Sequence, residues 1–416
     1  MRDSLVIEGG QRVEGKVRVS GAKNASLVII AASILARGRT ELENVPKIKD
    51  VEVLLDILTN QGCLTEWTDD GVLAIEVPDN IVPESPYDLS KKLRASNLLL
   101  GSLLGRKREA RISMPGGCDI GSRPMDLHLK GLQALGAKVN LEHGYIEATA
   151  ATLQGGRVYL DFPSVGATEN IMMLASVTPG TTIIDNAAKE PEIVDLANFL
   201  SAMGTRIRGA GTDLIKIEGA EKLKAVRYAV IPDRIEAGTY MAAATITGGD
   251  VLVENVIPTH LLPIKAKLEE TGARIAQING GIRVQGTGKI RPVDIKTLPY
   301  PGFPTDMQSQ MLSVLTIAEG TSVIVENVFD NRFQMVDELK RMGAKIKVEG
   351  HTAVVEGVKE LHGARVKATD LRAGAALILA SLVARGHTVI ENAHYIFRGY
   401  EDIERKLNGL GVKIIS

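Results

Sequence analysis

The chain has 416 residues, with 49 lysines and arginines against 50 aspartates and glutamates. The net charge of −1 argues against a general binder of nucleic acid or of membrane surfaces. The two cysteines, Cys63 and Cys118, form no CxxC pair and no Cys/His cluster at zinc spacing, so a disulfide scaffold and a structural zinc site are not expected. The length predicts two domains of roughly 200 residues each.

The N-terminal residues 1–8 contain no apolar core of signal-peptide length. The most apolar segment, residues 373–384, is too short to span a bilayer and ends at Arg385. We therefore expect a cytoplasmic protein without a membrane partner.

One pattern returns six times along the chain: an apolar helix, a strand, a loop, a closing helix that ends in glycine, and another strand. The closing glycines recur at intervals of 68 to 74 residues and are Gly62, Gly136, Gly204, Gly272, Gly343 and Gly411. Glycine directly after a helix is typical of a left-handed C-terminal cap. The spacing predicts six repeats of about 70 residues, three per domain, with the boundary near residues 230–232.

The fifth repeat illustrates the pattern. The β-branched segment 321–325 predicts a strand, and Val336, Leu339 and Met342 have the spacing of one helix face. Residues 345–348 then alternate as in a half-buried strand.

The apolar helices are predicted to be buried, because they are apolar on most faces. Several have a Ser, Thr or Asp at the start that could serve as an N-cap. Buried helices with strands outside them predict an inside-out α/β arrangement. The predicted starts lie near Ser20, Lys92, Ser164, Asp233, Thr305 and Asp370.

Charged side chains gather at two positions of the repeat. Those at the helix starts are Lys23 with Asn24, Arg94, Arg234, Asp306 and Arg372; those in the loops before the closing helices are residues 118–123, Lys189 with Glu190, Asn331 with Arg332, and Arg398. Helix starts and arginines both favour carboxylate and phosphate, so the pattern predicts a substrate with several negative charges. Any single arginine could instead serve only in capping or ion pairing.

The loop 115–124 is the most distinctive segment, with three glycines, the thiol of Cys118 and the guanidinium of Arg123. A cysteine near a cation can have a lowered pKa and become reactive. The alternative, a small buried hydrophobic residue, is our prediction for Cys63.

A second distinctive segment, residues 300–306, contains Pro304, which marks the turn before a helix and places Asp306 in its first turn. Asp306 could cap that helix or act as a general base, and the sequence favours neither.

Together these motifs resemble the enolpyruvyl transferase family, in particular the UDP-N-acetylglucosamine 1-carboxyvinyltransferases. The resemblance covers essentially the whole chain and rests on residues 20–25, the Cys118 loop, and residues 163–168, 300–308, 331–333, 370–373 and 398–400. It implies two domains of threefold-repeated α/β structure that close when the UDP-sugar binds. Residues 22–230 would form the first domain, and residues 231–416 with residues 1–21 the second.

The resemblance also implies the reaction, in which the sugar 3-hydroxyl adds to C2 of phosphoenolpyruvate and phosphate is then eliminated. This is the first committed step of peptidoglycan precursor synthesis, with no metal or organic cofactor. Asp306 would deprotonate the hydroxyl, and Cys118 would act as an acid or through a covalent adduct. Lys23 and Arg398 complete the implied catalytic set.

The implied substrate contacts follow the same motifs. Lys23, Arg123 and Arg398 would hold the phosphate, and Arg332 and Arg372 the carboxylate side. Asn24 would bind the sugar. The other expected substrate-binding residues are Arg94, Pro124, Met125, Asp126, Leu127, Ser164, Val165, Gly166, Asp306 and Val328, of which residues 123–127 and 164–166 would cradle the uridine diphosphate.

One position departs from the family pattern. Some members carry a lysine two residues before the serine of Ser-Val-Gly-Ala-Thr, where this chain has Phe162, so one diphosphate contact is expected to differ. Two alternatives stay open: the related transferase that acts on shikimate 3-phosphate, which should lack the cysteine loop, and a non-catalytic repeat protein that binds ligands.

Overall fold

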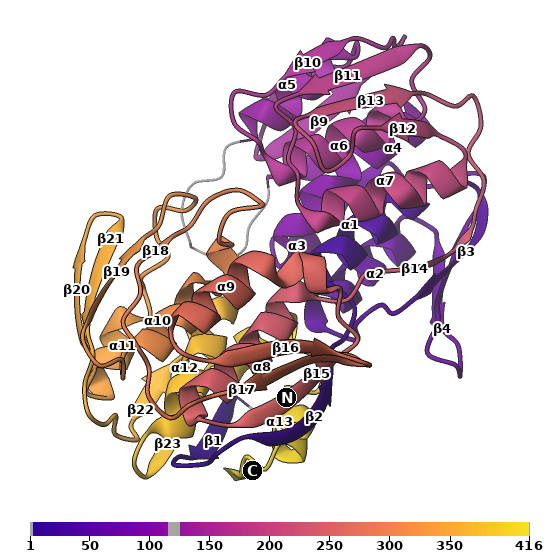
Figure 1. Ribbon diagram of the computed structural model, residues 1–416. Coiled ribbons are helices and arrows are strands. Elements are labelled where there is room, and N and C mark those ends of the chain that lie inside the picture. The colour runs from indigo at the N-terminus through magenta and orange to yellow at the C-terminus, as the bar shows by residue number, and fades with distance from the viewer. Residues whose placement is uncertain (1–2, 115–124, 416) are drawn as a thin grey trace. The chain divides into compact units, whose positions relative to one another are not determined.

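The computed structural model describes residues 3–114 and 125–415 of the chain (Figure 1). These residues form two compact units. The first unit comprises residues 21–114 and 125–231, and the second comprises residues 3–20 and 232–415.

Each unit contains three four-stranded sheets that share one pattern of directions: a strand at the sheet edge runs parallel to its neighbour, and two antiparallel strands follow. In the first unit the sheets are β14 (Arg227–Ala229), β3 (Gly38–Glu43), β5 (Leu73–Val77), β4 (Leu64–Trp67); β6 (Glu84–Ser85), β7 (Glu109–Ser113), β9 (Tyr145–Thr149), β8 (Lys138–Glu142); and β10 (Arg157–Tyr159), β11 (Thr181–Asp185), β13 (Leu214–Glu218), β12 (Arg206–Arg208). In the second unit they are β2 (Glu14–Arg18), β15 (Asp250–Glu254), β17 (Gly281–Gln285), β16 (Arg274–Ile278); β18 (Ile295–Lys296), β19 (Thr321–Val325), β21 (Thr352–Glu356), β20 (Lys345–Glu349); and β22 (Arg365–Lys367), β23 (His387–Glu391), β1 (Ser4–Glu8), β24 (Ile414–Ile415).

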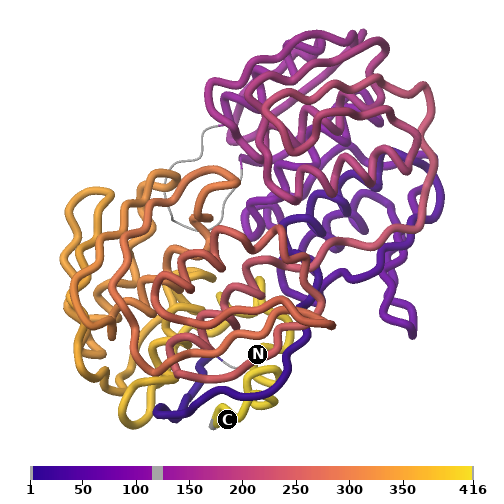
Figure 2. The backbone as a smooth tube through the Cα atoms, in the orientation of Figure 1, coloured from indigo at the N-terminus to yellow at the C-terminus, as the bar shows by residue number. Residues whose placement is uncertain are grey.

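The N-terminal strands complete two sheets of the second unit. Strand β1 pairs antiparallel with β23 through Val6 and Val389, and β2 pairs parallel with β15 through Lys16 and Leu252. Figure 2 shows the indigo N-terminal segment beside the yellow C-terminal part of the chain.

Six apolar helices lie inside the sheets. They are α1 (Lys23–Ser33), α4 (Leu99–Lys107) and α6 (Val165–Ala175) in the first unit, and α8 (Arg234–Thr247), α10 (Gln308–Leu315) and α12 (Leu371–Val383) in the second. In the second unit all three contact one another, and every residue of α12 from Leu371 to Leu382 is buried. The prediction of an inside-out α/β barrel built from six repeats is therefore confirmed.

The closing helices have the predicted glycine ends. They are α2 (Lys49–Asn60), α5 (Asp126–Ala134), α7 (Pro191–Met203), α9 (Leu262–Glu270), α11 (Val336–Arg341) and α13 (Ile403–Gly409). All six closing glycines have positive φ, from 89° at Gly411 to 126° at Gly204, a conformation that side chains disfavour. Short helices complete the chain: α3 (Tyr87–Ser90), η1 (Arg94–Leu98), η2 (Pro258–Leu261), η3 (Thr305–Met307) and η4 (Ala393–Arg398).

The predicted N-caps are confirmed at three helices. The side chains of Ser164, Asp233 and Asp370 accept hydrogen bonds from the first-turn N–H groups of α6, α8 and α12. The remaining predictions of serine and threonine caps are wrong. Helix α1 begins at Lys23, and Thr305 lies inside η3, where its hydroxyl donates to Glu326.

Ser20 has a different role from the predicted cap. Its hydroxyl donates to Glu401 Oε2 at 2.5 Å and accepts from Lys406 Nζ at 2.6 Å, and its N–H donates to Glu236 Oε2 at 2.8 Å. Glu236 and Lys406 themselves form a buried ion pair. This network in the second unit holds residue 20 in place, so the next helix starts three residues later than the sequence predicts.

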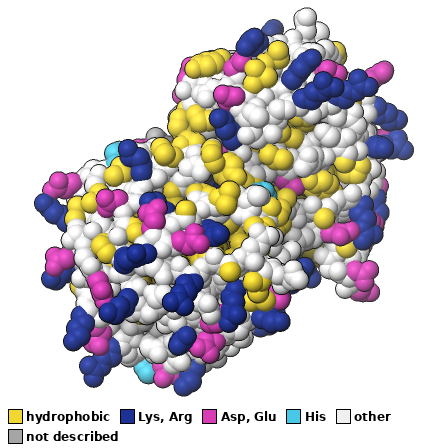
Figure 3. All heavy atoms as spheres, in the orientation of Figure 1, with side chains coloured by type: hydrophobic (Ala, Val, Ile, Leu, Met, Phe, Trp, Pro, Cys, Tyr) yellow, Lys and Arg dark blue, Asp and Glu magenta, His cyan; other side chains and the backbone are white. Residues whose placement is uncertain are grey.

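Among the described residues no helix is long and apolar enough to cross a membrane. Figure 3 shows cationic and anionic side chains interspersed over the face in view, as the near-zero net charge predicts.

Candidate functional site

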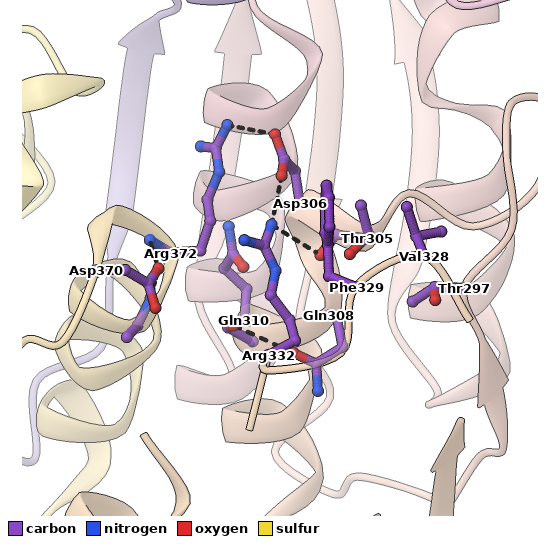
Figure 4. Close-up of polar contacts among 12 residues, drawn as sticks. Thr297, Thr305, Asp306, Gln308, Gln310, Val328, Phe329, Arg332, Asp370 and Arg372 are labelled. Atoms are coloured by element: carbon purple, nitrogen blue, oxygen red, sulfur yellow. Dashed lines mark hydrogen bonds and ion pairs between the residues drawn. The ribbon is translucent and has the colours of Figure 1, made fainter. Parts of the chain in front are cut away.

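Three predicted site residues of the second unit meet in an arrangement that we call the arginine cluster: Asp306, Arg332 and Arg372 (Figure 4). Arg372 Nη2 donates to Asp306 Oδ2 at 2.8 Å, and Arg332 Nη2 donates to Oδ1. The side chains of Arg332 and Arg372 are 3% and 6% exposed, whereas that of Asp306 is 24% exposed. The carboxylate is therefore held between two buried cations and keeps some access to solvent.

Local structure fixes each member of the cluster. Asp370 caps α12 by accepting from the N–H of Arg372 at 2.7 Å, which orients the first turn that carries this arginine. Asp306 lies in η3, directly after the turn that Pro304 marks, and its carboxylate accepts from Arg332 and Arg372. Asp306 thus serves in ion pairs rather than as the helix cap that was one of its two predicted roles.

The charges around Asp306 determine its protonation. Burial alone would raise its pKa, but the guanidinium groups of Arg372, Arg332 and Arg234 outweigh that effect and hold the pKa well below its usual range. Arg234 lies at the start of α8, with its guanidinium carbon 5.8 Å from the ring centroid of Tyr300. Asp306 is consequently a fixed carboxylate at neutral pH.

Glu326 is a structural element of this site that the sequence analysis missed. It is 1% exposed, and Oε1 accepts from Thr297 Oγ1 and from the N–H of Val328, each at 2.8 Å. Its Oε2 accepts from Thr305 Oγ1 at 3.0 Å. Glu326 therefore connects the end of β19 to the residue before Asp306 and fixes the predicted substrate contact Val328. Its position directly after a predicted strand was the only signal in the sequence.

Arg398 lies at the end of η4, which packs against α12. A side chain at Gly399 would meet Leu371 Cδ2 at 2.6 Å, and one at Gly374 would meet Ile396 Cγ1 at 2.4 Å. These close approaches place Arg398 next to the first turn of α12, which also carries Arg372.

In the first unit, Lys23 begins α1 and forms an ion pair with Asp50 at 2.7 Å, with side chains 14% and 4% exposed. Asn24 follows and is exposed. Helix α1 contacts η1, which begins at Arg94, so three predicted residues lie on adjoining elements.

The predicted nucleotide contacts that the structure describes, residues 125–127 and 164–166, lie at the starts of two packed helices, α5 and α6. Met125 precedes α5 and is buried, Asp126 is exposed and Leu127 is half-buried. Ser164, Val165 and Gly166 form the start of α6 and are half-buried. Phe162, where some relatives carry lysine, is 45% exposed.

Two side chains that the sequence analysis did not single out join these helices. His128 of α5 and Asn170 of α6 are buried, with His128 Nδ1 and Asn170 Nδ2 2.9 Å apart. Arg94 lies near enough to act on His128 electrostatically. No sequence pattern marked this pair, since its members are 42 residues apart.

Only one of the two cysteines, Cys63, lies among the described residues. Cys63 is 1% exposed, and burial raises the pKa of its thiol to about 11, so it is the small buried residue that was predicted. Cys118, Arg123 and Pro124 lie outside the described residues. Within residues 3–114 and 125–415, no group of three or more His, Cys, Asp or Glu side chains could hold a metal ion.

The sites in both units suit anions. The arginine cluster contains two guanidinium groups, a type that binds carboxylates in a bidentate manner, and both already pair with the carboxylate of Asp306. The α6 start offers backbone N–H groups and the positive end of a helix dipole.

Comparison with known proteins identifies similar chains. The family EPSP synthase (3-phosphoshikimate 1-carboxyvinyltransferase) matches residues 7–407. A UDP-N-acetylglucosamine 1-carboxyvinyltransferase 1 of Caldanaerobacter subterraneus is 56% identical, with 100% of this chain and 99% of that protein covered. A UDP-N-acetylglucosamine 1-carboxyvinyltransferase 2 of Carboxydothermus hydrogenoformans is 55% identical, with 99% of both chains covered.

Solved structures give the same fold. The enolpyruvyl transferase NikO from Streptomyces tendae superposes with a TM-score of 0.89 at 28% identity, covering 99% of this chain and 98% of that chain. An EPSP synthase from Acinetobacter baumannii superposes with a TM-score of 0.75 at 21% identity, covering 100% of both chains.

Proposed function

Because the chain belongs to the EPSP synthase family of carboxyvinyltransferases, we propose that it transfers the enolpyruvyl group of phosphoenolpyruvate to the 3-hydroxyl of UDP-N-acetylglucosamine and releases phosphate. The choice of UDP-N-acetylglucosamine as the acceptor is supported by the 56% identity, over the whole chain, to a protein named for that reaction. The likeness to an EPSP synthase is 21% identity and supports the fold alone.

The reaction is an addition followed by an elimination. The 3-hydroxyl oxygen bonds to C2 of phosphoenolpyruvate while C3 takes up a proton, which gives a tetrahedral intermediate. C3 then loses a proton, the C2–O bond to phosphate breaks, and the carbon–carbon double bond returns. The enzyme must supply a base for the hydroxyl, an acid for C3, and cations for the carboxylate and the phosphate.

Asp306 is the base in this proposal. Its depressed pKa makes it a weak base while both guanidinium groups are paired with it. When Arg332 and Arg372 bind the carboxylate of phosphoenolpyruvate, the positive field at Asp306 is partly neutralised and its pKa rises. The base is thus activated by the substrate whose reaction it assists.

The remaining roles are those that the resemblance to the family implies. Cys118 is the acid toward C3 or forms a covalent adduct, and Lys23, Arg123 and Arg398 bind the phosphate. Asn24 contacts the sugar, and Val328 is a further substrate contact. Residues 123–127 and 164–166 bind the uridine diphosphate, and Arg94 is a further substrate contact.

In this proposal each of the two units is an enolpyruvyl-transferase-like domain. The proposal places the reaction at the first committed step of peptidoglycan precursor synthesis, in the cytoplasm, and so in cell-wall formation, cell shape and cell division. The substrates are the only partners it requires.

The test is phosphate release from phosphoenolpyruvate with UDP-N-acetylglucosamine, with shikimate 3-phosphate, and with neither. We expect release that depends on the UDP-sugar. Release only with shikimate 3-phosphate would assign the protein to the other acceptor, and no release with either would favour a protein that binds ligands without catalysis.

A further inference from the structure

A buried imidazole lies between the first turns of α5 and α6 in the first unit. His128 is the third residue of α5 and is 6% exposed. One edge of its ring faces Gly166: a Cβ built on this glycine would lie 2.9 Å from His128 Cε1 and 3.3 Å from Nε2. The imidazole therefore borders the start of α6, and it leaves no room for a side chain at residue 166.

The hydrogen bonds of Asn170 fix which ring nitrogen carries the proton. Asn170 Oδ1 accepts from the N–H of Gly101 at 2.6 Å, and Nδ2 donates to the carbonyl of Asn97 at 3.1 Å. The amide orientation is thus determined, and its NH₂ group faces His128 Nδ1 at 2.9 Å. Nδ1 must accept this hydrogen bond, so a neutral ring carries its proton on Nε2.

The surroundings keep the ring neutral. Burial, and then the nearby guanidinium of Arg94, lower the pKa of His128 to about 4. Protonation of Nδ1 would also set two donors against each other at Asn170. His128 consequently presents a fixed Nε2–H at neutral pH, and no described residue accepts a hydrogen bond from it.

The start of α6 has free donors beside this group. The N–H of Ala167 is capped by Ser164 Oγ at 3.3 Å, but no described residue accepts from the N–H of Val165 or Gly166. Backbone N–H groups at a helix start, the guanidinium of Arg94 and a neutral N–H donor form a set that suits a phosphate oxygen.

We propose that His128 Nε2 donates a hydrogen bond to the diphosphate of the UDP substrate, in concert with the N–H groups of Val165 and Gly166. The inference rests on the proposed function for the identity of the substrate, and adds a recognition residue held in one tautomer by Asn170. It also gives Gly166 a reason to be glycine: a side chain there would displace the donor.

The test compares two substitutions of His128. Gln places an NH₂ group near the position of Nε2, whereas Asn reaches only the position of Nδ1. The exposed His143, in the loop between β8 and β9, gives the matched control His143→Asn. Binding of UDP-N-acetylglucosamine, UDP and uridine is measured by calorimetry, together with turnover at saturating substrate.

For His128→Asn we expect about tenfold weaker binding of UDP and of UDP-N-acetylglucosamine, the loss of one hydrogen bond to a charged group. Uridine binding and saturated turnover should stay within about twofold, and His128→Gln should bind UDP within about threefold of wild type. His143→Asn should bind all ligands normally.

Two results would overturn the inference: wild-type UDP affinity in His128→Asn, or equal losses for UDP and uridine. The ratio of UDP to uridine affinity is independent of the folded fraction, so even a destabilised variant shows whether His128 contacts the diphosphate. Wild-type protein that binds UDP but transfers no enolpyruvyl group would contradict the proposed function and leave the His128 contact standing.

Discussion

Arg372 of the sixth repeat donates to Asp306 of the fifth at 2.8 Å, and so joins the first turn of α12 to η3. The guanidinium is buried and the carboxylate is the more exposed partner. The pair places a potential base at the surface of the site with its cation behind it. In the proposed function, substrate binding by that cation would connect recognition of a carboxylate to activation of Asp306.

Asp306→Asn should lower kcat about 100-fold, since a positioned general base contributes at least that factor. The Michaelis constant for the UDP-sugar should change much less, because the amide has nearly the same shape. Steady-state kinetics measure both. Asp294→Asn is the control, since Asp294 is exposed and accepts from the N–H of Val323 outside the cluster. Equal turnover in the two variants would remove Asp306 from the chemistry.

Cys118→Ser should abolish turnover or reduce it about 100-fold, as expected for the loss of an acid or nucleophile. Cys63→Ser should keep turnover and lose stability, because Cys63 is buried among apolar side chains. In the folded protein iodoacetamide should modify Cys118 but not Cys63, whose thiol has a raised pKa. Normal kinetics in Cys118→Ser would exclude this residue from the mechanism.

The contribution of His128 to the stability of the first unit should fall as the pH drops from about 6.5 to about 4, whereas Asp195 of the same unit, whose pKa burial raises to about 6, acts in the opposite sense. Between these pH values His128 is protonated in the unfolded chain but neutral in the folded one. Its titration therefore favours unfolding in acid by roughly 2–3 kcal/mol. Trp67, the single tryptophan, lies in this unit and reports its unfolding in urea by fluorescence. The difference in unfolding free energy between wild type and His128→Gln should shrink by this amount over the same pH range, and a difference that does not change with pH would mean that His128 titrates normally in the fold.

Glu326→Ala should both destabilise the second unit and lower turnover. The substitution leaves the hydroxyls of Thr297 and Thr305 and the N–H groups of Val328 and Phe329 without their acceptor, at a cost on the order of 3–5 kcal/mol. Hydrogen exchange in β19 and steady-state kinetics measure the two effects. Glu326→Gln retains Oε1 and should be milder in both; an alanine variant as stable and active as wild type would contradict the assigned role.

The repeat architecture could be predicted because its signals are local. Gly204 and Gly411 follow apolar helical spacing, and Asp233 and Asp370 sit one residue before buried helices, so caps and helix ends were visible in short windows. The partners of the N-terminal strands could not be predicted in this way. Val6 pairs with Val389 across almost the whole chain, and only the folded structure brings them together.

The candidate site was predicted by residue type, whereas its internal contacts were not. An arginine at a helix start indicates an anion site, but the sequence cannot show that Asp306 already occupies two of these arginines. His128 and Glu326 were missed for the same reason, since their importance comes from hydrogen bonds to distant residues. Ser20 was misread as a cap because Glu236 and Lys406 engage it from far along the chain.

The most direct test of the central claim is mass spectrometry of the UDP-sugar after incubation with phosphoenolpyruvate and the purified protein, with released phosphate measured in the same sample. We predict a product heavier than UDP-N-acetylglucosamine by one carboxyvinyl group, formed in equal amount to phosphate, and no product from an acceptor that lacks the 3-hydroxyl. An unmodified UDP-sugar, or phosphate released without any change in it, would contradict the account.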